Sequence, residues 1–155
     1  IADAVIKGNA SFDLQHALEA CVATARKRSY EGIGDYIDKG YIPAERNGTS
    51  VSSTLEYAYD DWCIAQLARY LKREDIEQEF IKRSEHWRNV YDASIGFMHP
   101  RLSDGSFKKS FDVLNTEGQG FIEGNAWNFS LYVPHNPAAM IEVMGGKKKF
   151  VTHLD

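Results

Sequence analysis

The carboxylate of Glu123 lies among aromatic and aliphatic residues where a loop is expected to become a helix. The surrounding segment is Phe121-Ile122-Glu123-Gly124-Asn125-Ala126-Trp127-Asn128-Phe129. Gly124 allows the backbone to turn. Trp127 is expected on the same helical face as Glu123, because four residues make about one turn. A lone acid in such a place is a candidate proton donor.

Two opposing effects decide whether such an acid can hold a proton. Apolar surroundings raise the pKa of a carboxyl group because they disfavour its charged form. The positive end of a following helix acts in the opposite direction. A proton is kept near neutral pH only where burial or a second carboxylate prevails. The local pattern by itself favours a simpler interpretation, in which Glu123 caps the helix, since capping acids outnumber catalytic ones.

Length and composition predict one globular domain. The chain has 155 residues, of which 43% are hydrophobic and 26% charged, and a net charge of -4. No clustered basic face is present, so nucleic acid is not expected as a partner. No apolar run is long enough to span a bilayer, so no membrane segment is expected. Phe150 and Leu154 lie one turn apart and predict a helix that starts near the end of the chain, so we expect a fragment of a longer protein.

Local signals predict the helices that must position the candidate acid. Asp13 can cap a helix that begins at Leu14 and ends near Arg26. A long connection follows, over residues 29–52, which we interpret as an ordered functional loop because it is rich in tyrosine as well as glycine.

The central helix is predicted from a capping box formed by Ser53 and Glu56, and it should run to about Arg73. It has two apolar sides, so we expect it to be covered on most of its circumference. Its acids Asp60 and Asp61 are interpreted as residues near the start of the helix or bonded to neighbouring loops, rather than as ligands for a substrate.

The next helix is predicted over residues 75–92, with a single apolar stripe and a Glu79–Arg83 pair on its more polar side. A covered helix followed by an amphipathic one is typical of a layered helical barrel or an α-solenoid. Asp104-Gly105 predicts the turn of a short β-hairpin between residues 96–102 and 105–107. A helix after Glu123 must end before Pro134, and Asn136 should cap one that ends at Gly145-Gly146. No cluster with metal-ligand spacing is found in this chain.

Four motifs, taken together, are more specific than any single residue. They are Gly40-Tyr41-Ile42-Pro43-Ala44, Ser50-Val51-Ser52-Ser53-Thr54-Leu55-Glu56-Tyr57-Ala58-Tyr59-Asp60-Asp61-Trp62, Gly96-Phe97-Met98-His99-Pro100-Arg101-Leu102 and Glu123-Gly124-Asn125-Ala126-Trp127. In this order they resemble the glycoside hydrolase family 92 α-mannosidases, and the likeness covers nearly the whole chain.

The resemblance implies an all-α fold: part of an (α/α)6 barrel of paired inner and outer helices with long loops and a short β-hairpin. Residues 1–155 would be a fragment of the catalytic domain, without the rest of the barrel and the N-terminal β-sandwich. By similarity Glu123 is the general acid, which replaces the capping interpretation. Asn125 and Trp127 match the motif and are expected to line or support the sugar site, although packing alone would also explain Trp127. Arg101 lies in a matching loop and receives no role.

The same resemblance implies a calcium-dependent, inverting exo-α-mannosidase that acts on mannose-containing glycans, with an α-1,2 linkage favoured but not specified by the sequence. The base and most calcium ligands are expected in missing parts of the same polypeptide, so the chain alone should be inactive. The full-length protein is expected to be secreted, periplasmic or at the cell surface. Two alternatives remain open: a helical binding or scaffold module, and a different (α/α)6 glycosidase.

Overall fold

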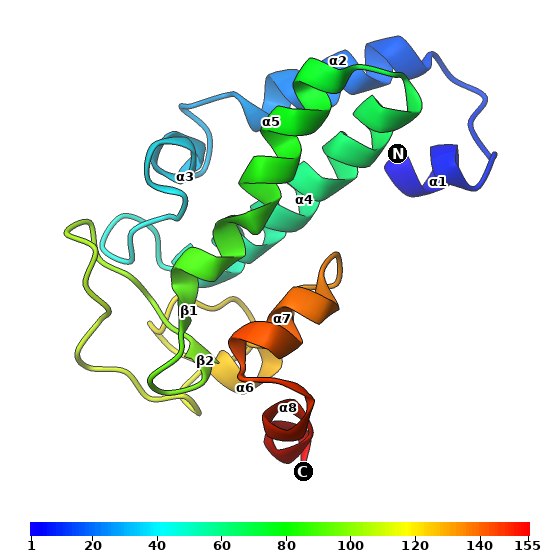
Figure 1. Ribbon diagram of the computed structural model, residues 1–155. Coiled ribbons are helices and arrows are strands. Elements are labelled where there is room, and N and C mark those ends of the chain that lie inside the picture. The colour runs from blue at the N-terminus through cyan, green and yellow to red at the C-terminus, as the bar shows by residue number, and fades with distance from the viewer.

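Helices dominate the computed structural model, which describes residues 1–155 (Figure 1). The helices are α1 (Ala2–Ile6), α2 (Leu14–Ala25), α3 (Ile33–Lys39), α4 (Ser50–Tyr70), α5 (Glu74–Ser84), the 3-10 helix η1 (Glu85–Val90), α6 (Ala126–Phe129), α7 (Pro137–Val143) and α8 (Lys147–Leu154). The strands β1 (Tyr91–Asp92) and β2 (Phe97–Met98) form one antiparallel pair. The predicted all-α class is confirmed, while the short hairpin lies at residues 91–98 and not at the predicted 96–107. None of the helices combines the length and the apolar character that crossing a bilayer requires.

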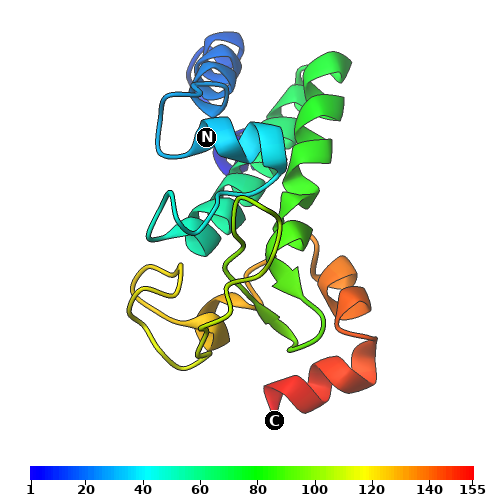
Figure 2. The same cartoon turned by 90° about the vertical axis from the view of Figure 1, so that its left-hand side faces the viewer.

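Helix α4 is the centre of the molecule, with α5 packed along it in the opposite direction (Figures 1 and 2). Its C-terminal half contributes Leu67 to a core with Leu18 of α2 and Phe80 of α5. Its N-terminal half contributes Leu55 to a second core that contains Trp87, together with residues from β2, α6 and α7. The predicted covering of this helix on most sides is therefore confirmed, and α4 joins two cores.

The helix starts that depend on local caps agree with the sequence. The Asp13 side chain accepts a hydrogen bond from His16 N (3.0 Å) at the start of α2. The Asn136 side chain accepts one from Ala139 N (3.2 Å) at the start of α7. The predicted loop over residues 29–52 was wrong in part, because it contains helix α3, which lies between two glycines in the left-handed conformation.

The predicted capping box of α4 is wrong. The helix begins at Ser50, three residues earlier, and Ser53 lies inside it. Its first amides bond to a distant carbonyl instead: Gly120 O accepts from Val51 N (2.9 Å) and Ser52 N (3.1 Å). A long-range acceptor replaces the local cap, and Glu56 instead accepts a hydrogen bond from Tyr132 Oη (3.1 Å).

Two further predictions change at the end of α5. The helix predicted to Asp92 stops at Ser84 and continues as the 3-10 helix η1. The last two residues of the predicted range, Tyr91 and Asp92, form strand β1 instead. The hairpin predicted around Asp104-Gly105 is reduced to a single bridge between Arg101 and Phe107, although the turn itself is present.

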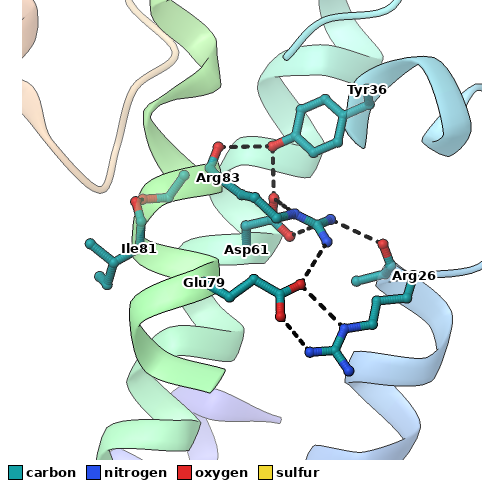
Figure 3. Close-up of polar contacts among 8 residues, drawn as sticks. Arg26, Tyr36, Asp61, Glu79, Ile81 and Arg83 are labelled. Atoms are coloured by element: carbon teal, nitrogen blue, oxygen red, sulfur yellow. Dashed lines mark hydrogen bonds and ion pairs between the residues drawn. The ribbon is translucent and has the colours of Figure 1, made fainter. Parts of the chain in front are cut away.

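Asp61 lies in the middle of α4. The interpretation from the sequence was different, because it placed Asp61 near the start of the helix or against a neighbouring loop. Its carboxylate accepts from Arg83 Nε (3.0 Å) and lies 3.0 Å from Arg83 Nη2 (Figure 3). The Tyr36 hydroxyl lies 2.8 Å from Asp61 Oδ2 and 3.1 Å from Arg83 O. Burial raises the pKa of Asp61 to about 7, while Arg83 and Tyr36 oppose that rise. The network joins α3, α4 and α5. Glu79 continues it to Arg26 at the end of α2.

Candidate active site

Glu123 lies in an exposed turn between the core residue Phe121 and helix α6. Its backbone φ is +51°, in the left-handed range that side-chain-bearing residues rarely adopt. Its carboxylate makes no hydrogen bond or ion pair with any residue of this chain. The expectation that Glu123 shares a helical face with Trp127 was wrong, because α6 starts only at Ala126. The capping interpretation was wrong as well, since the cap is Asn125.

The residues immediately before Glu123 are attached to the amino end of α4. Gly120 supplies the carbonyl that accepts two amide protons there, and Ile122 N donates to Ser52 Oγ (3.1 Å). Phe121 is 5% exposed and packs in the core. A Cβ on Gly120 would come within 2.9 Å of Val51 Cγ2. The backbone before the candidate acid is thus held close to α4, and only a glycine fits at this contact.

The residues immediately after Glu123 are held by the Asn125 cap. Asn125 Oδ1 accepts from Trp127 N (3.0 Å) and Asn128 N (3.4 Å), while Asn128 Oδ1 accepts from Asn125 N (3.0 Å). Asn125 Nδ2 donates to Leu114 O (3.0 Å). The side chain of Asn125 therefore orders the turn on which Glu123 lies, so it supports the candidate site.

Trp127 is half-buried by neighbours from two other elements. Its ring meets Phe97 of β2 edge-on at 4.9 Å and stacks on His153 of α8 at 5.1 Å. The side chain remains 46% exposed. Packing therefore accounts for part of this indole, and the rest is open to contact by a ligand.

Arg101 and its neighbour His99 in the same motif hold the loop that follows β2. Arg101 Nε donates to Gly105 O (2.7 Å) and Nη1 donates to Asn89 O (3.1 Å). His99 is 8% exposed and contacts Asp92. Sequence reasoning assigned neither residue a role, although a histidine and an arginine within one apolar motif were a usable signal.

No three His, Cys, Asp or Glu side chains of this chain gather in a way that could hold a metal ion. The clusters of carboxylates that commonly hold calcium in proteins are therefore not found among these side chains.

The model of the glycosyl hydrolase family 92 catalytic domain matches residues 1–155. The chain belongs to this family. It is 31% identical to an uncharacterized secreted glycosidase of Arthroderma benhamiae, over 100% of this chain and 25% of that protein.

Solved structures agree with the family assignment and with the predicted fold class. A family 92 α-mannosidase from Bacteroides thetaiotaomicron is 34% identical, with a TM-score of 0.94 over 99% of this chain and 20% of that chain. The same α-mannosidase has been solved in complex with mannoimidazole. A family 92 inverting mannosidase from the same organism is 33% identical, with a TM-score of 0.94 over 99% of this chain and 22% of its own. The family 92 chain described here thus spans only about a quarter or a fifth of the length of these relatives.

Proposed function

We propose that the whole protein hydrolyses terminal α-mannosides with inversion and that this chain supplies its general acid, Glu123. The observation that carries the proposal is an unpaired carboxylate on a turn fixed on both sides, by α4 before it and by the Asn125 cap after it. Membership of family 92 and the mannosidase neighbours, one of them solved with mannoimidazole, support mannose-containing glycans as substrates.

Inversion requires two carboxyl groups with different tasks. One is protonated and donates its proton to the departing glycosidic oxygen, while the other, roughly 6.5 to 9.5 Å away, activates water on the opposite face of the sugar. We assign the first task to Glu123. A fixed backbone is useful for this step, because proton donation depends on a hydrogen-bond distance between donor and leaving oxygen.

The second carboxylate, the calcium ion and most sugar contacts are proposed to lie in parts of the polypeptide outside this chain, in the rest of the (α/α)6 barrel and the N-terminal β-sandwich. Calcium, when bound, would help to hold and distort the terminal mannose. The chain alone is proposed to be inactive, because a proton donor without base and substrate walls accelerates hydrolysis little. We further propose an α-1,2 linkage and a secreted, periplasmic or cell-surface location.

The test is Glu123→Gln in the whole protein, assayed on two α-mannosides. One has an alkyl or sugar leaving group, which needs protonation, and the other has an activated aryl leaving group, which does not. We expect kcat/KM to fall about 10²- to 10⁴-fold for the first substrate and far less for the second. Glu117→Gln is the matched control, because Glu117 is exposed in the preceding loop. Equal losses on both substrates, or none, would refute the assignment.

A panel of aryl glycosides, assayed with and without a calcium chelator, separates the alternatives. A mannosidase of the proposed kind cleaves the α-mannoside and loses that activity in the chelator. Preference for another sugar would indicate a different (α/α)6 glycosidase. Binding without turnover would indicate a helical binding module.

A further inference from the structure

His99 is buried within the loop that leads to Glu123. Its ring stacks with Phe107 (4.9 Å between centroids, 10° between planes) and with Phe111 (4.2 Å, 23°). Both phenylalanines belong to the segment that follows β2, which has almost no regular secondary structure between residues 99 and 125. The histidine therefore packs against the part of the loop that has no helix or sheet to hold it.

Both ring nitrogens of His99 face oxygen acceptors. Nδ1 lies 3.0 Å from Asp92 Oδ2, and Nε2 lies 2.8 Å from Lys108 O. A carbonyl oxygen can only accept, so Nε2 carries a proton and donates it to the loop backbone. Asp92 is itself held, because its Oδ1 accepts from Ser94 N (2.9 Å) and Ser94 Oγ (2.6 Å). The fixed carboxylate holds the orientation of the imidazole ring, which keeps Nε2 at 2.8 Å from Lys108 O.

Contacts continue from this point to the candidate acid. Lys108 N donates to Pro100 O (2.9 Å) and Lys108 Nζ donates to Gly118 O (2.6 Å). The ring of Phe111 lies 6.4 Å from that of Phe121, which is two residues before Glu123. The His99 bond thus fixes the start of a segment whose other end carries the catalytic turn.

We infer that His99, oriented by Asp92, is a positioning residue that holds the loop from Phe107 to Phe121 and so sets the place of the Glu123 carboxyl against the leaving oxygen. The inference rests on the proposed function of Glu123. The hydrogen bond with Lys108 O, and not the packing of the ring alone, holds this loop in place.

Two substitutions at position 99 in the whole protein separate the hydrogen bond from packing. His99→Phe keeps an aromatic ring against Phe107 and Phe111 but cannot donate to Lys108 O. His99→Gln loses the ring but carries an amide that can donate to the same carbonyl. Packing alone predicts that Phe is the milder change, whereas the positioning inference predicts that Gln is.

The readout is the ratio of kcat/KM for the poor-leaving-group mannoside to kcat/KM for the activated aryl mannoside. This ratio does not depend on how much of the enzyme is folded, since one active population cleaves both substrates. We expect His99→Phe to lower the ratio about 10- to 100-fold, as a small misplacement of a reacting group does, and His99→Gln to lower it less. His16→Gln, on the exposed face of α2, should leave it unchanged.

An unchanged ratio in His99→Phe, or a larger fall in His99→Gln, would overturn the positioning inference. If Glu123→Gln lowers the ratio in the same assay, the proposed function stands despite that result. If Glu123→Gln leaves the ratio unchanged, the proposed function itself fails. Should His99→Phe yield no folded protein, Asp92→Ala takes its place, because it removes the carboxylate that orients the His99 ring. A ratio equal to that of the wild type would then refute the inference.

Discussion

A substitution at Gly120, which contacts the amino end of α4, should change both the local stability of this contact and the activity of the enzyme. Gly120 has φ +84°, and a Cβ there would lie 2.9 Å from Val51 Cγ2, 3.1 Å from Pro100 Cγ and 3.1 Å from Ser50 Oγ. Gly118, two residues away, has φ +64° and no atom within 4 Å of its virtual Cβ. Gly120→Ala and Gly118→Ala therefore share the backbone strain and differ in steric overlap.

The backbone strain and the steric overlap give the expected loss of free energy in each variant. A left-handed conformation disfavours a residue with a Cβ by about 1–2 kcal/mol, which applies to both variants. Overpacking against well-ordered neighbours adds about 1–3 kcal/mol, which applies to Gly120→Ala only. The loop should relieve the overlap by moving away from α4, and then Gly120 O no longer accepts from Val51 N and Ser52 N.

Hydrogen exchange at the Val51 and Ser52 amides measures this opening within the whole protein, because exchange reports local free energies. The difference of about 1–3 kcal/mol between the variants corresponds to exchange about 5- to 150-fold faster in Gly120→Ala than in Gly118→Ala. Activity on a poor-leaving-group mannoside should fall in parallel. If exchange at both amides is the same in the two variants, Gly120 is not the group that holds the loop on α4, and the reasoning is wrong.

Two further predictions concern the buried polar residues beside α4. Tyr36→Phe removes the hydroxyl that contacts Asp61. Denaturant titrations should show that it lowers the free energy of unfolding of the helical domain by about 1.5–3 kcal/mol, whereas Tyr70→Phe, at an exposed tyrosine, should change it little. Equal effects of the two substitutions would contradict a buried charged hydrogen bond at Tyr36. Burial, aided by Arg83 and Lys82, lowers the pKa of His86 from 6.5 to about 4. The unfolded chain then binds a proton between these values that the folded chain does not, so stability should be lost as pH falls from 6.5 to 4. His86→Asn should flatten this part of the stability curve, and an unaltered curve would contradict it.

The sequence by itself determined the helices whose signals are local. The caps at Asp13 and Asn136 act on amides three residues away, so their residue types suffice to place α2 and α7. The covering of α4 also followed from the sequence, because two apolar sides on one helix need two partners. The importance of Glu123 came from the resemblance to a family, since the local pattern favoured a cap.

Only the tertiary structure decided how the candidate acid is held. The start of α4 at Ser50 depends on Gly120 O, and Ile122 bonds to Ser52 across 70 positions of sequence. Asp61 pairs with Arg83 from another helix, across 22 positions. Composition and periodicity carry no record of such partners, because they describe each segment alone. Glu123 lies in a strained turn, and its carboxylate makes no polar contact within this chain. The place of this turn depends on contacts that exist only when α4, the loop and the Asn125 cap have come together.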